Sequence, residues 1–166
     1  TAVELLNKGK DLVIIDDFSN SNEKALDSIR KITGKDFKFY EMDYKNREKL
    51  EKVFEENKIE AVINFAGFKA VGESVAKPLM YYRNNIDSTL SLLEVMNEFN
   101  CKKIVFSSSA TVYGKPKSLP IKEDFELSTT NPYGTTKLYI EGILKDLYVS
   151  DNEWSIAILR YFNPIG

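Results

Sequence analysis

The sequence predicts an α/β fold built on a parallel sheet, and three observations lead to this expectation. Short apolar runs rich in β-branched residues alternate with longer segments of helical periodicity. The runs are apolar nearly throughout, as in strands buried on both faces. Each run is separated from the next by enough chain for the crossover helix that parallel strands require. We therefore expect a doubly wound sheet with helices on both of its faces.

The first half of the chain contains three of the expected strands. Residues 2–8 have the pattern of the last turns of a helix, and Gly9 is its stop. Helices are expected over 23–33 and 47–57, the second beginning at the cap Asn46. The residues expected to be buried are Ala25, Ile29 and Ile32 in the first of these helices, and Leu50, Val53 and Phe54 in the second. The expected strands cover residues 11–16, 37–42 and 60–65.

The second half continues the alternation with longer helices. One helix is expected over 78–100, with Pro78 near its start. A second helix is expected over 132–149, after a loop that ends near Asn131. The expected strands cover residues 103–107 and 154–161. The apolar stripe of the 78–100 helix consists of Leu79, Tyr82, Ile86, Leu90, Leu93 and Met96.

Composition narrows the classes of function. The 166 residues carry 23 basic and 25 acidic side chains, so we expect neither nucleic-acid binding nor a polybasic membrane signal. No apolar run approaches the roughly 18–20 residues that span a bilayer. The chain has no histidine and one cysteine, Cys101, which excludes an internal disulfide and histidine chemistry within this chain; no metal site is predicted. A cytoplasmic location fits this cysteine usage.

Ligands of open parallel sheets bind beyond the carboxyl ends of the strands, so we take those ends as one set. An acidic residue such as Asp16 at that position can accept both hydroxyls of a ribose and repel a 2′-phosphate, which favours NAD over NADP. The alternative for Asp16 is a solvated turn residue. The strand ends carry Asp16-Asp17, Asp43-Tyr44, Phe65-Ala66-Gly67, Ser107-Ser108-Ser109 and Phe162-Asn163.

The glycine-rich phosphate loop that should precede the first helix of a dinucleotide site is absent from these residues, and its place would be just upstream of Thr1. The chain opens within a helix that has no beginning. We therefore expect residues 1–166 to be a partial Rossmann-like NAD-binding domain, truncated at the first strand and helix, with most of its first βα unit missing.

Tyr133 and Lys137 are the sharpest pair of candidate catalytic residues. Their i, i+4 spacing places both on one face of the last helix. A neighbouring ammonium favours ionised tyrosine, so the pair suits a base that takes a hydroxyl proton while a hydride leaves the same carbon. The three hydroxyls at 107–109 could bond a substrate hydroxyl. The alternatives are that Tyr133 and Lys137 are an ordinary surface pair and that the serines at 107–109 form a polar turn at the end of a strand.

Two further features suggest polar contacts. Asn84 and Asn85 lie in the middle of an expected helix, where asparagine is a poor helix former, so we expect a buried polar contact there. Lys69, beyond the third strand, is either a phosphate or ribose contact or a solvated lysine.

Ser109, Tyr133 and Lys137 in this order resemble the Ser-Tyr-Lys set of the extended short-chain dehydrogenase/reductases. Four runs resemble, more closely, the UDP-glucose 4-epimerase family, and the similarity extends over essentially the whole chain. The runs are NFAGFKAVGES (64–74), FSSSATVYG (106–114), NPYGTTK (131–137) and LRYFNP (159–164).

The resemblance implies interconversion of UDP-glucose and UDP-galactose in galactose metabolism, by transient oxidation at C4 with tightly bound NAD. Tyr133 would be the base, Lys137 would hold the nicotinamide ribose, and Ser109 would bond the reacting oxygen. Ser109, Tyr133 and Asn163 would contact the UDP-sugar. The implied NAD site comprises Asp16, Asp17, Phe18, Ser19, Asn20, Ser21, Asp43, Tyr44, Phe65, Ala66, Gly67, Phe68, Lys69, Asn84, Ser109, Tyr133, Lys137 and Phe162.

The same resemblance implies a homodimer through the helices near 78–100 and 132–150, and a C-terminal substrate domain that residues 1–166 lack. These residues alone are therefore expected to be inactive and to hold no stable NAD.

Three alternatives remain at this stage. Sugar-nucleotide 4,6-dehydratases carry an Asp-Glu pair where this chain has Ala110 and Thr111, so we disfavour that reaction. An epimerase or decarboxylase acting on UDP-N-acetylglucosamine or UDP-glucuronate is the second. A non-catalytic dinucleotide-binding sensor is the third, although such proteins usually lose the tyrosine or the lysine.

Overall fold

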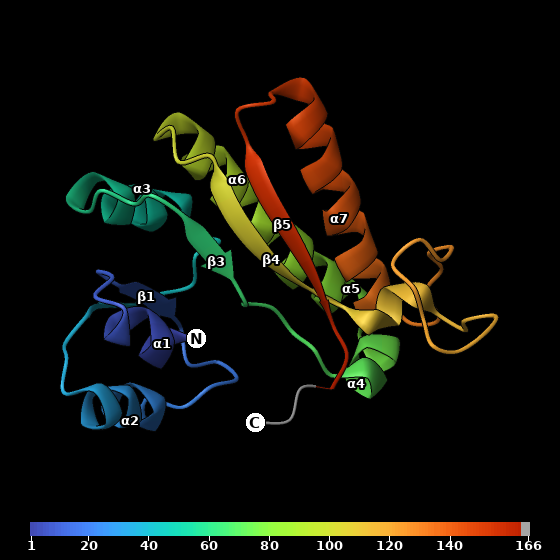
Figure 1. Cartoon of the computed structure of the whole chain (residues 1–166), viewed down its shortest axis with the longest axis horizontal. Coiled ribbons are helices and arrows are strands. Elements are labelled where there is room, and N and C mark those ends of the chain that lie inside the picture. The colour runs from blue at the N-terminus through green and yellow to red at the C-terminus, as the bar shows by residue number, and fades with distance from the viewer. Residues whose placement is uncertain (164–166) are drawn as a thin grey trace.

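A computed structural model describes residues 1–163, and it confirms the α/β class with parallel strands and flanking helices (Figure 1). Pro164, the last residue of the fourth run, lies outside the described residues. The described strands form two parallel sheets rather than one. The first consists of β1 (Val13–Asp16) and β2 (Lys38–Glu41), and the second has the order β3 (Val62–Asn64), β4 (Lys103–Ser109) and β5 (Ser155–Tyr161).

One hydrophobic core serves both sheets. It is built around α3 (Arg47–Glu56), α6 (Ser88–Glu98) and α7 (Pro132–Ser150), together with β4. Val13 of β1 and Val62 of β3 pack against this same core, although the two strands belong to different sheets. Along the described chain, β1 pairs only with β2, and β3 pairs only with β4. Each of these strands therefore has one edge without a strand partner.

The helices of the first half show which apolar residues are buried. In α3, the Asn46 side chain accepts the Lys49 N–H, and Leu50, Val53 and Phe54 are buried, as expected. The expected buried face of α2 (Lys24–Thr33) is wrong, because Leu26 is its buried residue and Ile32 is 67% exposed. The reason is that α2 packs against the short α1 (Ala2–Asn7), which covers a single edge of it.

The single helix expected over 78–100 consists of three segments. These are α5 (Pro78–Tyr82), a π-helical turn (Arg83–Asp87) and α6. A further helix, α4 (Val71–Ala76), lies before them and was not expected. π-Helical turns are often found at functional sites. The expected stripe is also only partly buried, because Leu79 is 79% exposed and Leu90 is 39% exposed.

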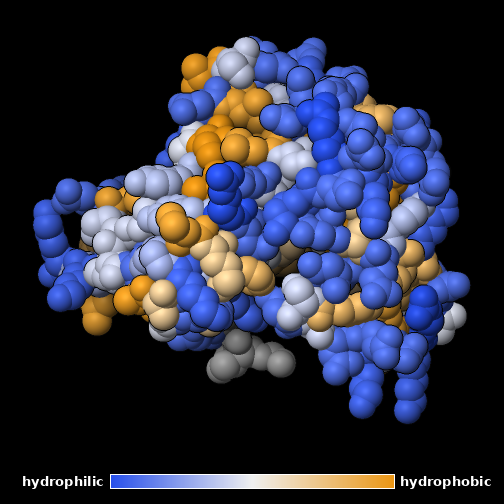
Figure 2. Space-filling model, turned by 180° about the vertical axis from the view of Figure 1, so that it is seen from behind, coloured by the Kyte–Doolittle hydropathy of each residue, from blue (hydrophilic) through white to orange (hydrophobic). Residues whose placement is uncertain are grey.

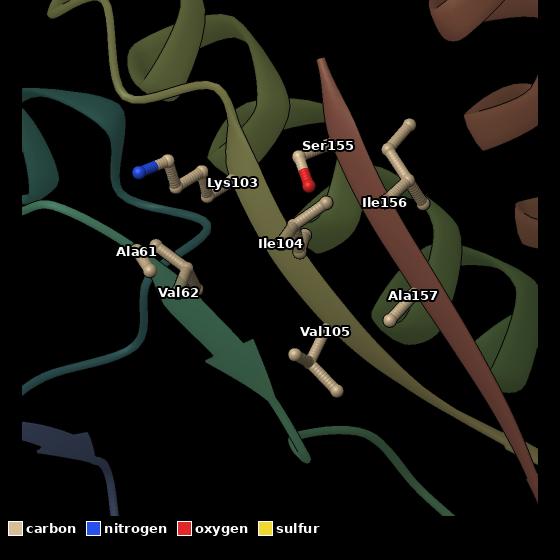
Figure 3. A pocket seen from close by; sticks show the side chains of 8 residues that line it. All are labelled: Ala61, Val62, Lys103, Ile104, Val105, Ser155, Ile156 and Ala157. Atoms are coloured by element: carbon tan, nitrogen blue, oxygen red, sulfur yellow. The ribbon is translucent and has the colours of Figure 1, made fainter.

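The helices α6 and α7 cover one face of the three-stranded sheet, and that side of the molecule carries patches of apolar surface (Figure 2). Over the described residues, the opposite face of this sheet is partly open. Ile63 is 36% exposed and Leu159 is 41% exposed. A shallow hollow of about 150 Å³ lies over this face, lined by residues of all three strands (Figure 3). The expected cover on both faces is therefore incomplete within residues 1–163.

β4 runs two residues further than expected, to Ser109, and this brings its end next to the start of α7. A 3₁₀ turn (Ala110–Tyr113) follows, with the Ser109 hydroxyl as its cap. α7 begins at Asn131, whose side chain accepts the Gly134 N–H. None of the helices within residues 1–163 is both long enough and apolar enough to cross a membrane.

Candidate active site

Asp16 closes β1 and organises the turn that follows it. One of its carboxylate oxygens, Oδ1, accepts the Phe18 N–H at 2.9 Å and the Ser21 hydroxyl at 2.6 Å. Phe18 has a φ of 54°, and its ring lies 5.3 Å from that of Phe39. Because both bonds are made to the same oxygen, the second oxygen of Asp16 has no hydrogen-bond partner within residues 1–163 and can accept bonds from a ligand. The predicted Asp17, Ser19 and Asn20 are exposed along this turn.

A lysine joins two of the predicted cofactor residues that are distant in sequence. Lys45 Nζ lies 3.2 Å from Asp43 Oδ2 and donates to Asn84 Oδ1 at 3.1 Å. The end of β2 is thereby connected to the π-helical turn. The neighbouring Tyr44 packs against the core, and burial raises the pKa of its phenol. The Tyr44 ring therefore lies in the core.

The loop after β3 is held by Asn85, which sequence reasoning did not include in the site. Asn85 is 3% exposed; its Oδ1 accepts the Phe68 N–H at 2.8 Å, and its Nδ2 donates to the Phe68 carbonyl at 3.0 Å. Nδ2 also donates to Thr136 of α7 at 3.1 Å. This confirms the buried polar contact expected from mid-helix asparagines. Gly67 has a φ of 134°, and a Cβ there would lie 3.0 Å from Asn85 Oδ1.

With its backbone held in this way, the loop turns other side chains outward. Phe65 is 50% exposed, and Ala66 and Lys69 are also exposed. The loop is therefore a fixed backbone segment that offers an aromatic ring and an ammonium to a ligand.

The three serines at the end of β4 have different surroundings. The Ser109 hydroxyl accepts the Thr111 N–H at 3.2 Å and the Thr111 hydroxyl at 3.0 Å. Ser108 is buried and donates to Glu141 at 2.6 Å, so its hydroxyl does not face the site. The Ser107 carbonyl accepts a hydrogen bond from Lys137. The expectation of three hydroxyls acting on a substrate is therefore wrong for Ser108, because its side chain points toward α7.

Lys137 is a buried ammonium, with 5% of the residue exposed. Its Nζ donates to the Ser107 carbonyl at 2.8 Å and lies 4.8 Å from the centre of the Phe106 ring. It forms no ion pair within residues 1–163, and burial lowers the pKa of Lys137 to about 8. Within residues 1–163 one of its three donors makes a hydrogen bond, so the other two can bond hydroxyl groups of a ligand.

Tyr133 is half-buried and lies one turn before Lys137, as the spacing predicted. The next residue, Gly134, packs closely on the 3₁₀ turn, since a Cβ there would be 3.2 Å from the Thr111 carbonyl. The first turn of α7 is thereby set against the segment that bonds Ser109. Phe162 and Asn163 follow β5 and are exposed, and the Phe162 ring stacks on Tyr113 at 6.5 Å.

The arrangement defines the class of protein. The strands of this Rossmann-like fold end at Asp16 in one sheet and at Ser109 in the other, and α7, which carries Tyr133 and Lys137, packs against β4. A family described as GDP-mannose 4,6 dehydratase matches residues 1–166, and the chain belongs to this family.

Within this class the chain is similar to UDP-glucose 4-epimerases, which confirms the resemblance of the four runs. It is 61% identical to the UDP-glucose 4-epimerase of Bacillus subtilis and 55% identical to that of Dictyostelium discoideum, each over 100% of this chain. The alignments cover 49% and 48% of those proteins, so the chain spans about half the length of the curated relatives it matches.

Solved structures of UDP-glucose 4-epimerases are also similar to this chain. The UDP-glucose 4-epimerase from Bifidobacterium longum, in complex with NAD⁺ and UDP, has a TM-score of 0.97 and 57% identity, covering 99% of this chain and 50% of its own. The enzyme from Stenotrophomonas maltophila, with bound NAD and formylated UDP-arabinopyranose, has a TM-score of 0.96 and 40% identity, covering 99% of this chain and 49% of its own.

Proposed function

We propose that the whole protein interconverts UDP-glucose and UDP-galactose with a resident NAD, as part of galactose metabolism. The observation that carries this proposal is the set on β4 and α7: Ser109 at the strand end, and Tyr133 with the buried Lys137 on the helix that packs against it. Similarity to UDP-glucose 4-epimerases over the full 166 residues supports it.

The residues present fit NAD. Asp16 has an unused carboxylate oxygen for ribose hydroxyls, the loop 65–69 has a backbone fixed by Asn85, and Lys137 has unused donors. We propose that the predicted set from Asp16 to Ser21, together with Asp43, Tyr44, Phe65–Lys69, Asn84 and Phe162, lines this site. NAD, when bound, supplies a nicotinamide that accepts a hydride from the sugar C4 and returns it.

The chain's own residues would manage the proton. Tyr133 would take the proton of the 4-hydroxyl as C4 is oxidised and give it back when C4 is reduced on the other face. Lys137, held by the Ser107 carbonyl, would bond the nicotinamide ribose and stabilise the negative charge on Tyr133. Ser109 would bond the reacting oxygen, and Asn163 would begin the UDP-sugar site.

The description of the matched family suggests a dehydratase as a second candidate. Elimination of water needs an acid and a base beside the oxidised carbon. Ala110 and Thr111 lie in the 3₁₀ turn, at the positions where sugar-nucleotide 4,6-dehydratases carry an Asp-Glu pair. Neither side chain titrates in the physiological range. These residues therefore favour epimerisation.

The test uses the whole protein and UDP-galactose, with no NAD added. We expect UDP-glucose to form, because the cofactor is resident. NAD released on denaturation without any UDP-glucose would keep the cofactor and move the substrate to UDP-N-acetylglucosamine or UDP-glucuronate. Absence of both would contradict the proposal and favour a non-catalytic protein.

Asp16→Asn tests the cofactor site. The amide keeps an acceptor for the Phe18 N–H but removes the charge, and hydrogen bonds to charged groups contribute about 1.5–3 kcal/mol. We expect the affinity for NAD to fall at least about tenfold and discrimination against NADP to weaken. The content of NAD and of NADP that the protein retains after gel filtration measures the affinity and the discrimination. Asp27→Asn, on the exposed side of α2, is the matched control. Equal NAD retention in both variants would exclude a ribose contact at Asp16.

We propose that residues 1–166 form part of an NAD-binding Rossmann domain, with its first βα unit mostly elsewhere in the protein and a separate substrate domain. The edges of β1 and β3 that have no strand partner among residues 1–163 support this, because the two strands pack against one core although they belong to different sheets. A strand between these two edges would join the two sheets into one.

We also propose a homodimer through α5, α6 and α7. Leu79, Leu90 and Tyr139 are exposed, and the Tyr139 ring stacks on Tyr82 at 6.3 Å. α5 and α7 lie against each other, so Leu79 and Tyr139 belong to neighbouring helices and form one apolar face. A cytoplasmic location belongs to the same proposal and is supported by the single, buried free thiol of Cys101.

Charges on this apolar face should separate the dimer. We expect Leu79→Glu/Tyr139→Glu to elute as a monomer in size exclusion with light scattering, because two buried unpaired charges of the same sign are costly to desolvate. Ile32→Glu, at an equally exposed apolar residue of α2, should remain dimeric. A dimeric double variant would place the interface elsewhere.

A further inference from the structure

A second charged constellation lies behind the Ser-Tyr-Lys set. Glu141 is fully buried on α7, and both of its carboxylate oxygens receive hydrogen bonds. Arg160 of β5 donates from Nε at 3.0 Å to Oε1 and from Nη2 at 2.7 Å to Oε2, and the Ser108 hydroxyl donates to Oε1 at 2.6 Å. This is a forked, charge-assisted pair in a dry environment.

The same guanidinium also reaches the segment beyond β4. Arg160 Nη1 donates to the Tyr113 hydroxyl at 2.8 Å and to the Glu123 carbonyl at 3.2 Å. Its Cζ lies 4.9 Å from the centre of the Tyr113 ring, which in turn stacks on Phe162. One side chain thus ties together β5, the 3₁₀ turn and the loop that leads to α7.

The position of this pair relative to the reacting residues is specific. Glu141 lies one helical turn beyond Lys137 and two turns beyond Tyr133, so the three occupy one face of α7. Ser108 directly precedes Ser109, and Arg160 is the register partner of Ser108 in the β4–β5 ladder. The pair therefore connects α7 to the strands at the position next to the catalytic serine.

Stability alone does not explain such a pair. Replacing a buried ion pair by apolar residues of similar volume is often neutral or stabilising, whereas removing one partner is strongly destabilising. What the forked pair adds is a fixed distance and orientation between the elements it joins. Misplacement of a reacting group by 1 Å can cost about 100-fold in rate.

We propose that Glu141 and Arg160 are positioning residues that set α7, and with it Tyr133 and Lys137, against Ser109. This inference rests on the proposed function for its kinetic consequence, and on the contacts above for its structural one. Neither residue touches the reacting atoms; each acts through the helix or strand that carries them.

The decisive variant is Glu141→Leu/Arg160→Met in the whole protein, which removes both charges and keeps the volume. We expect a melting temperature close to that of the parent, a KM for UDP-galactose within about threefold, and a kcat lowered about 10- to 100-fold. If the double variant had both the kcat and the melting temperature of the parent, the proposal would be overturned, because the pair would then serve folding only.

Lys102→Met is the matched control. Lys102 pairs with Asp151 at 2.8 Å and Glu153 at 2.5 Å, at the far end of α7 and β4, and its side chain is 18% exposed, the same as that of Arg160. We expect it to keep the parent kcat. If the double variant does not fold, Ser108→Ala removes only the hydrogen bond to Glu141. It should lower kcat several-fold with KM unchanged, and an unchanged kcat would overturn the proposal.

A readout independent of the reaction separates this proposal from the proposed function. The Lys137 side-chain resonance, followed by NMR against pH in lysine-labelled protein, reports how enclosed that ammonium is. Burial lowers the pKa of Lys137 to about 8, so displacement of α7 should move its titration toward the ordinary lysine range. We expect this in the double variant and not in Lys102→Met. No movement in either would overturn the positioning role even if the parent protein lacked epimerase activity.

Discussion

Tyr133→Phe is expected to lower kcat for UDP-galactose by about 10³-fold, with NAD content unchanged. The substitution removes only the hydroxyl that is proposed to take and return the proton of the sugar, and it keeps the aromatic ring on α7. Turnover by the whole protein and NAD released on denaturation are the two measurements.

The matched control is Tyr148→Phe on the same helix, where the ring is 51% exposed and far from the strand ends. It should keep the parent kcat. A Tyr133→Phe protein that turns over within threefold of the parent would transfer the proton step to another group. Residues 1–166 contain no histidine, so a replacement group from this part of the protein would be another tyrosine, a carboxyl, an amine or a thiol.

Lys137→Met is expected to abolish turnover and, at the same time, to make the protein more stable at neutral pH. The folded protein holds this ammonium in a buried site, and burial lowers the pKa of Lys137 from 10.5 to about 8. Each pKa unit corresponds to about 1.4 kcal/mol, so the buried charge costs up to about 3 kcal/mol. Methionine has a similar length and carries no charge.

The stability difference between the parent and Lys137→Met should depend on pH. Between about pH 8 and 10.5 the unfolded lysine binds more protons than the folded one, so the free energy of unfolding of the parent rises with pH across that window. The methionine variant should lack this rise and should exceed the parent most clearly below pH 8. Urea unfolding at pH 7 and pH 10, at matched cofactor content, measures it. A less stable variant at pH 7 would show that the bond to the Ser107 carbonyl outweighs the cost of burying the charge.

Local patterns predicted most of the elements, because they depend on neighbours in sequence. The cap at Asn46 follows from its residue type, and the buried stripe of α3 follows from the spacing of its apolar residues. The π-helical turn did not, because it accompanies the bonds that Asn85 makes with Phe68 and Thr136, residues far from it in sequence. The buried face of α2 depends on α1, and no periodicity within α2 contains that information.

The sequence predicts which types of residue form the candidate site, but it does not predict which contacts their side chains make. Strand ends and helical spacing predict Asp16, Ser109, Tyr133 and Lys137 as candidate site residues, since strand ends gather at one edge of a parallel sheet. The role of Ser108 was misassigned because strand alternation, which turns it toward Glu141, was not applied to the serine run. The sequence shows Arg160 only as part of the run LRYFNP. Its pairing with Glu141 depends on the packing of β5 against α7, which no local pattern contains.

The open edges of β1 and β3 also bear on how residues 1–163 behave when no other strand occupies them. Unpaired N–H and C=O groups along a strand are a template for any other extended chain. β3 is short, which limits that tendency, but β1 is an apolar strand whose Val13, Ile14 and Ile15 have high β-propensity. Expressed by itself, this part of the protein should therefore self-associate through added strands, and a peptide that mimics a parallel strand should restore its solubility.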